Sequence, residues 1–126
     1  LCHHILQPTN DTPKQLKIIK NIEEIEISLN NSVPLALVLN EIITNSVKYA
    51  FKEVKEGIIH ISCCKKNGAI EVKIKDNGVG LPEEQINKNK GIGITLIEGF
   101  VKQLKGNLKY GNENGCFFVF SFHDNI

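Results

Sequence analysis

Residues 40–51 read Asn40-Glu41-Ile42-Ile43-Thr44-Asn45-Ser46-Val47-Lys48-Tyr49-Ala50-Phe51. Within this stretch Glu41, Asn45 and Lys48 are spaced i, i+4 and i+7, which puts their side chains on one face of a helix. The simplest interpretation is a solvated helix edge on which Glu41 and Lys48 are ordinary surface charges. Asn45 argues against it, because asparagine is a poor helix former without a local hydrogen-bonding partner. A carboxylate, an amide oxygen and an ammonium group on one face can instead bind Mg²⁺ and phosphate, since hard cations take oxygen ligands.

The helix that carries this face is predicted to run from about Ser32 to Phe51. Ser32 is a good N-cap residue, and Pro34 falls in the first turn, where the missing N–H of proline costs no hydrogen bond. The core-facing stripe of this helix consists of Leu35, Leu39, Ile42 and Ile43.

Most of the remaining chain reads as short strands. Asn67-Gly68 is a strong signal for a tight turn, so residues 58–65 and 69–75 are predicted to pair as a hairpin. Further strands are predicted at residues 16–21, 25–29, 107–111 and 116–122. Strands joined by hairpins, with only two helices, predict an α+β fold in which the helices cover one face of a mainly antiparallel sheet.

Asp76 ends the second strand of the hairpin on the same side as its isoleucine and valine residues. A carboxylate on a buried face is costly unless it accepts hydrogen bonds, and the amino group of adenine would be a suitable donor. The alternative makes Asn77-Gly78 another hairpin turn and Asp76 an ordinary turn residue. Residues 79–82, Val-Gly-Leu-Pro, do not continue as a strand and so argue against that alternative.

Gly91-Ile92-Gly93 stands just before a second predicted amphipathic helix, which Gly106 can end. Residues without side chains let backbone N–H groups and a helix N-terminus approach an anion such as a phosphate. A lone Gly-x-Gly is more often just a turn, and the chain contains neither a P-loop nor the full dinucleotide fingerprint. The core-facing residues of this helix are Ile97, Phe100, Val101 and Leu104.

Composition narrows the class of protein. The chain has 126 residues, 41% of them hydrophobic, which is enough for one compact core. Residues 1–15 are predicted to be a linker or the start of a fragment, and residues 16–126 one domain. A net charge of +1 gives no overall attraction to nucleic acid or membrane, and no apolar run is long enough to span a bilayer. The four cysteines fit neither a disulfide framework nor a zinc ribbon, which favours the cytoplasm.

Three motifs taken in order resemble a known set: residues 40–51, then Asp76-Asn77-Gly78-Val79-Gly80-Leu81-Pro82, then Gly91-Ile92-Gly93-Ile94. The set resembles the ATP-binding catalytic domain of sensor histidine kinases, most of all those of the second dimerisation-domain type. That domain belongs to a superfamily that also contains gyrase, the heat-shock chaperone with the same type of ATP-binding domain, and the mismatch-repair ATPases. The resemblance covers about residues 16–122 and implies a Bergerat-type fold, a two-layer α/β sandwich with a mixed sheet. ATP would lie under a lid formed by residues 81–90.

The resemblance also implies roles for the polar residues of the first motif. Asn45 would coordinate Mg²⁺, and Lys48 would contact phosphate. Glu41 would orient or polarise the group that attacks the phosphate, and it would reach the metal only indirectly. Lys88 and Lys90 are weaker candidates for phosphate contacts.

The remaining residues of the expected site surround the base and the phosphates. Asp76 would accept a hydrogen bond from the adenine amino group. The other residues implied to contact the nucleotide are Tyr49, Gly78, Gly80, Gly91, Gly93 and Ile94. Relatives usually carry threonine or serine where this chain has Cys116, so a hydroxyl near the adenine is missing.

The implied activity is transfer of the γ-phosphoryl group of ATP to a histidine on a dimerisation domain of the same protein, with a response regulator downstream. None of the four histidines present here has the sequence context of such an acceptor, and all four read as structural or surface residues. The domain would work in the cytoplasm, either in a cytoplasmic kinase or as the cytoplasmic part of a membrane-bound sensor. Two alternatives remain open: a serine kinase of the anti-sigma type, and a binding module in which nucleotide only controls docking to another protein.

Overall fold

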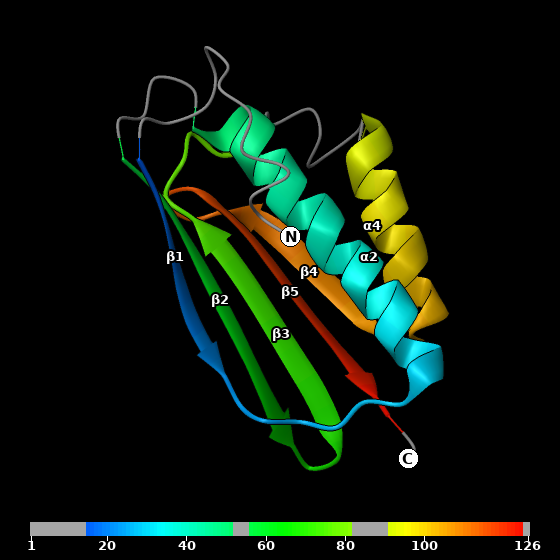
Figure 1. Ribbon diagram of the computed structural model, residues 1–126. Helices are drawn as coiled ribbons and strands as arrows, with labels where there is room; N and C mark the ends of the chain where they lie inside the picture. Colours follow the sequence, from blue (N-terminus) through cyan, green and yellow to red (C-terminus); the bar gives the residue numbers. More distant parts are fainter. Residues whose placement is uncertain (1–14, 52–55, 82–90, 125–126) are drawn as a thin grey trace.

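The chain forms two layers, a five-stranded sheet and a pair of helices that cover one of its faces (Figure 1). This computed structural model describes residues 15–51, 56–81 and 91–124. The elements in chain order are β1 (Gln15–Ile22), α2 (Leu29–Asn45), η1 (Ser46–Ala50), β2 (Glu56–Lys66), β3 (Ala69–Asp76), α4 (Gly91–Gln103), β4 (Asn107–Asn112) and β5 (Cys116–His123). Residues 1–14 of the predicted linker and residues 82–90 of the predicted lid lie outside the described residues, while Gln15, also predicted as linker, begins β1.

The sheet has the strand order β1-β2-β3-β5-β4. β1 pairs with β2 in parallel, and the other neighbours are antiparallel. The parallel pair follows from the connection, because the chain crosses over through α2 between these two strands. At the β2–β3 turn Asn67 has φ 53° and Gly68 has φ 82°, the two positive angles that the dipeptide predicts. The predicted α+β class, with a mixed and mainly antiparallel sheet, is therefore confirmed.

The core lies between the sheet and the two helices. β3 and β5 contribute every second residue to it, as alternating burial along both strands shows. The buried stripe of α2 is centred on Val38 and Ile42, while Leu35 and Leu39 are only partly buried. The predicted residues Ile97 and Val101 of α4 are buried, and so is Leu104, the residue after its end. These two stripes pack on the sheet and bring α2 and α4 side by side (Figure 1).

The start of α2 differs from the prediction. The helix begins at Leu29 with Ser28 as the N-cap, so Pro34 lies inside it rather than in its first turn. The predicted strand at residues 25–29 is wrong, because residues 23–28 have no regular structure. Ile25 and Ile27 still pack against the core, and this packing accounts for their alternation in the sequence. Ser32 donates its hydroxyl to the carbonyl of Leu29 instead of capping the helix.

Asp124, from the other end of the chain, fixes where α2 begins. Its carboxylate accepts hydrogen bonds from the Ser28 N–H (2.9 Å), the Ser28 hydroxyl (2.6 Å) and the Asn31 side-chain amide (2.5 Å). These donors, the Ser28 hydroxyl first, lower the pKa of Asp124. A carboxylate at a helix N-terminus is favourable because it complements the helix dipole. The contact therefore ties the end of β5 to the start of α2.

Replacing Asp124 with asparagine is expected to lower the melting temperature at pH 7 by about 3–6 °C. Because the pKa of Asp124 is lower in the folded protein, the carboxylate stabilises the fold at pH values above its unfolded-state pKa, which is near 4. This stabilisation disappears as the pH falls through the folded-state pKa. The difference between wild type and Asp124→Asn should therefore shrink below pH 4. Thermal melts followed by circular dichroism at pH 7 and pH 3 measure it, and an equal difference at both pH values would contradict the assignment.

Both helices end differently from the prediction. The last turn before Phe51 is the π-helix η1 rather than a continuation of the α-helix. At the end of α4 the left-handed residue is Lys105, with φ 56°, and the Gly106 N–H bonds back to the Val101 carbonyl at 3.0 Å. Gly106 is required for space instead, since a Cβ there would lie 2.4 Å from the carbonyl oxygen of Ser121.

Candidate functional site

Asp76 is the last residue of β3 and is buried, with 3% of its surface exposed. Its position on the apolar side of the strand is thus confirmed, and the hairpin-turn alternative is wrong because the next strand partner of β3 is β5. The protein itself supplies three hydrogen-bond donors. Oδ1 accepts from the N–H groups of Gly78 (2.9 Å) and Cys116 (3.0 Å), and Oδ2 accepts from the Ser46 hydroxyl (3.0 Å).

Because of these donors, burial of Asp76 is not in itself evidence for a bound base, as the sequence had suggested. A carboxylate in this position does not need a ligand to satisfy its burial cost, since the protein already provides for it. A carboxylate has about four acceptor positions, two on each oxygen. Counting donors from the described residues, both positions on Oδ1 are used, while Oδ2 keeps one for a further donor. The site can therefore accept one hydrogen bond from a ligand without losing any of its own.

The segment that follows Asp76 is fastened to three different elements. The Asn77 side chain bridges β2, accepting from the Ile58 N–H (2.8 Å) and donating to the Glu56 carbonyl (3.2 Å). The Val79 N–H donates to the Ala50 carbonyl of η1 at 2.7 Å. Residues 77–79 therefore form a fixed wall beside Asp76.

Further along, Asn112 of β4 makes two bonds of 2.8 Å with the backbone N–H and carbonyl of Leu81. This pair extends the same wall to the edge strand of the sheet.

The glycines of this segment have reasons within the protein. A Cβ on Gly78 would lie 2.1 Å from the carbonyl oxygen of Ala50, which is impossible without moving the backbone. Gly80 has φ +85°, and a Cβ there would lie 2.7 Å from Oδ1 of Asn112. Close packing against the Ala50 backbone accounts for Gly78, and the positive φ beside the Asn112 side chain accounts for Gly80, before any ligand is considered.

Gly115 faces Asp76 from the other side. It has φ +124°, and a Cβ there would lie 2.0 Å from the backbone carbonyl oxygen of Asp76. This close approach lets the next residue, Cys116, direct its N–H at the Asp76 side chain. Burial first, and the neighbouring Asp76 carboxylate second, raise the pKa of the Cys116 thiol to about 12. The thiol is therefore neutral near pH 7, and Cys116 contributes its backbone to Asp76.

Asn45 and Gly93 lie together where α2 meets α4. A Cβ on Gly93 would come within 2.6 Å of Nδ2 of Asn45, so the absence of a side chain leaves room for this amide. Gly91, Ile92 and Gly93 form the first turn of α4 rather than a loop before it. The first N–H groups of a helix have no partner within it, so they can bond to groups outside the helix. Ile94, a predicted nucleotide contact, is buried at 3% exposure.

The other predicted residues occupy less defined positions. Glu41 is half-buried one helical turn before Asn45. Lys48 is exposed in η1. The prediction that Lys48 shares a face with Glu41 assumed an α-helix with 100° per residue, and the wider turn of a π-helix does not keep that spacing. The side chain of Tyr49, and Lys88 and Lys90, lie outside the described residues.

The described residues offer few side chains that could bind a metal ion at this site. In the described part of the chain no three His, Cys, Asp or Glu residues gather where they could hold a metal ion. Mg²⁺ in proteins commonly takes one or two protein ligands and completes its shell with substrate phosphates and water. The amide of Asn45 fits that smaller role, and Glu41 lies one helical turn away, where it would reach the metal only indirectly.

Four residues of the site were not predicted from the sequence: Ser46, Asn77, Asn112 and Gly115. Ser46 and Asn77 lie inside the quoted motifs, yet neither shows by its spacing that its partner is Asp76 or β2. Gly115 could have been suspected from its place in a tight turn. Asn112 carries no local signal at all.

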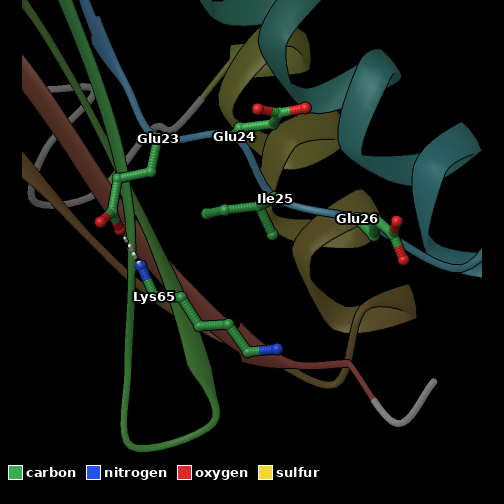
Figure 2. Close-up of a pocket in the computed structure, with 5 residues that line it drawn as sticks. All are labelled: Glu23, Glu24, Ile25, Glu26 and Lys65. Atoms are coloured by element: carbon green, nitrogen blue, oxygen red, sulfur yellow. Dashed lines mark hydrogen bonds between the residues drawn. The ribbon is translucent and has the colours of Figure 1, made fainter.

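A separate open pocket of about 420 Å³ lies at the other end of the sheet. Figure 2 shows its lining, Glu23, Glu24, Ile25, Glu26 and Lys65. The Lys65 N–H donates to Oε1 of Glu23 at 2.7 Å. Lys65 pairs with Ile70 near the start of β3, whereas Asp76 ends that strand, so this pocket has no part in the site.

The family of histidine kinase-, DNA gyrase B- and HSP90-like ATPases matches residues 30–126. The blue-light-activated histidine kinase 1 of Erythrobacter litoralis is 31% identical over 87 residues, which is 68% of this chain and 24% of that protein. The anti-sigma F factor of Geobacillus kaustophilus is 19% identical over 106 residues, covering 75% of this chain and 73% of the relative. The chain thus spans about a quarter of the first relative and most of the second.

Solved structures agree on the fold. The histidine kinase domain of the Erythrobacter litoralis EL346 blue-light-activated kinase superposes with a TM-score of 0.78 at 20% identity, over 86% of this chain and 51% of that chain. The Acinetobacter baumannii histidine kinase AdeS gives 0.73 at 21% identity, over 90% and 56%. No helix in the described ranges is both long and apolar enough to cross a membrane. The sequence match over most of the chain and the shared fold together show that this chain belongs to the histidine kinase-, DNA gyrase B- and HSP90-like ATPase family.

Proposed function

We propose that this chain is the Mg²⁺-ATP-binding catalytic domain of a histidine kinase. The observation that carries the proposal is the convergence at the C-terminal end of β3. A buried carboxylate with one acceptor position left lies there beside η1, and the residue before η1, Asn45, contacts the first turn of α4. Asp76 would accept a hydrogen bond from the base, and the N-terminus of α4 would bind phosphates. Ser46 and Asn45, neighbours in the chain, link these two places.

The residues then have the following roles. Asp76 Oδ2 accepts from the adenine amino group, against the wall formed by Gly78 and Gly80. The first turn of α4, Gly91 to Gly93, presents its N–H groups to the phosphates, and Ile94 and Tyr49 complete the pocket. Mg²⁺, when bound, would supply positive charge against the phosphates.

The polar residues of the first motif would act nearest the reacting phosphate. Asn45 would hold Mg²⁺, Lys48 would contact phosphate, and Glu41 would orient the attacking group. Each of these contributions positions reactants or offsets negative charge, and phosphoryl transfer depends on little else from the protein.

The phosphate acceptor is proposed to be a histidine on a dimerisation domain of the same protein, with a response regulator as the next partner, in the cytoplasm. His60 on β2 and His123 on β5 are exposed strand residues, and neither has the sequence context expected of the acceptor. A second candidate function is serine phosphorylation, favoured by the anti-sigma F factors, whose similarity covers about three quarters of both chains.

Incubation of the full-length gene product with Mg²⁺ and ATP labelled on the γ-phosphate separates these functions. Acid-labile, alkali-stable label on the protein is expected for a histidine kinase. Acid-stable label on an added protein partner would instead support the serine kinase. Binding of ADP in a calorimeter without any transfer would leave a nucleotide-controlled binding module, and absence of ADP binding would overturn the proposal altogether.

Gly93→Ala is expected to lower the affinity for ADP about tenfold with Mg²⁺ present, and much less in the presence of a chelator. The added Cβ would displace the Asn45 amide, the flexible end of a side chain, so the fold should persist. Calorimetric titrations with Mg²⁺ and with chelator measure the two affinities. Equal losses under both conditions would show that Gly93 matters for packing and not through Asn45.

A further inference from the structure

Ser46 is a buried polar residue, with 6% exposure, at the first position of η1. Its backbone N–H donates to the carbonyls of Ile42 and Ile43, as a helical residue does. Serine hydroxyls inside helices commonly bond back to a carbonyl of their own helix. The hydroxyl of Ser46 instead leaves the helix and donates to Oδ2 of Asp76, thirty positions away in the sequence.

The two oxygens of Asp76 are held in different ways. Oδ1 is held by two backbone N–H groups, from Gly78 and Cys116, which no side-chain substitution removes. Oδ2 is held, among the residues that the structure describes, by Ser46 alone. Bonds to Oδ1 leave the carboxylate free to rotate about its Cβ–Cγ bond within the limits of those two contacts. The direction of the last free acceptor position on Oδ2 therefore depends on Ser46.

We infer that Ser46 is a positioning residue that sets the base selectivity of the nucleotide site, an inference that rests on the function proposed above. By giving its proton to one side of Oδ2, Ser46 leaves a single acceptor position in a fixed direction. An exocyclic amino group on a purine can donate to that position. A 6-oxo group cannot, because it would place a carbonyl oxygen against a carboxylate oxygen.

The geometry around Cys116 agrees with these two roles, in which backbone N–H groups hold Oδ1 and the Ser46 hydroxyl holds Oδ2. Cys116 reaches Asp76 through its backbone, and its Sγ lies 4.0 Å from the carbonyl oxygen of Phe117. The hydroxyl on the carboxylate thus comes from the helix layer and not from β5. A hydrogen bond to a charged group is stronger than one between neutral groups, so its loss has a measurable effect.

The test compares the affinities of ADP and inosine diphosphate, in which a 6-oxo group replaces the 6-amino group and the neighbouring N1 carries a hydrogen. Calorimetry with Mg²⁺ is applied to the wild type, Ser46→Ala and Ser46→Thr. In Ser46→Ala the affinity for ADP should fall about tenfold while that for inosine diphosphate stays the same, so the selectivity ratio falls about tenfold. Ser46→Thr, which keeps the hydroxyl, should retain most of the ratio.

A merely structural role for Ser46 predicts equal losses for both nucleotides, and that result would overturn the inference. Should Ser46→Ala fold poorly in a thermal melt, Ser46→Cys has nearly the same volume and only a weak donor, and the same fall in ratio is expected. Failure of the proposed function looks different, because the wild type would then bind neither nucleotide. An unchanged ratio in Ser46→Ala, with tight ADP binding in the wild type, would reject the role of Ser46 alone.

Discussion

Asp76→Asn is expected to lower the affinity for ADP and ATP at least about 100-fold while the fold persists. The asparagine Oδ1 can still accept from the N–H groups of Gly78 and Cys116. Its Nδ2 replaces the oxygen that accepts from Ser46, and a donor would then face the donor of the base. Calorimetric titration of ADP with Mg²⁺, together with a thermal melt, measures both parts of this expectation.

The matched control is Asp124→Asn, the same substitution at a buried carboxylate near the opposite end of the sheet. It should change stability and leave nucleotide affinity as it is, since Asp124 contacts the start of α2 and not the site. Unchanged affinity in Asp76→Asn would refute the recognition of the base by Asp76. Equal loss of affinity in both variants would mean that general destabilisation is being measured.

Gly115→Ala is expected to lower the free energy of unfolding by about 3 kcal/mol or more. The new Cβ would lie 2.0 Å from the carbonyl oxygen of Asp76, on a backbone with φ +124° that alanine rarely adopts. Relief requires β5 to move away from the end of β3, which would also break the bond from Cys116 to Asp76. Urea unfolding followed by circular dichroism gives the change in free energy.

Gly99→Ala is the control for this experiment. Gly99 is an exposed residue of α4, and a Cβ there would meet nothing within 4 Å. Alanine is the better helix former, so this variant should gain about 0.5–1 kcal/mol. A Gly115→Ala protein as stable as the wild type would show that the backbone at β5 can shift without cost.

Local patterns in the sequence predicted much of the fold. The turn at Asn67-Gly68 and the alternation along β3 and β5 depend on residues close together in the chain, and the structure confirms them. The same alternation placed Asp76 on the buried side. The predicted strand at residues 25–29 failed because Ile25 and Ile27 alternate without a neighbouring strand to pair with.

The sequence by itself determined the class of fold, the hairpins, the second helix and the motif residues from which the family could be inferred. Only the tertiary structure decided where α2 begins, why Gly78 and Gly115 must be glycine, and which donors surround Asp76. The physical reason is the separation of the partners. Asp124 lies 96 residues from Ser28, Cys116 lies 40 from Asp76, and Ser46 lies 30 from it. Periodicity and propensity describe a chain over one or two turns or strands, whereas these contacts exist only after the sheet and helices have packed.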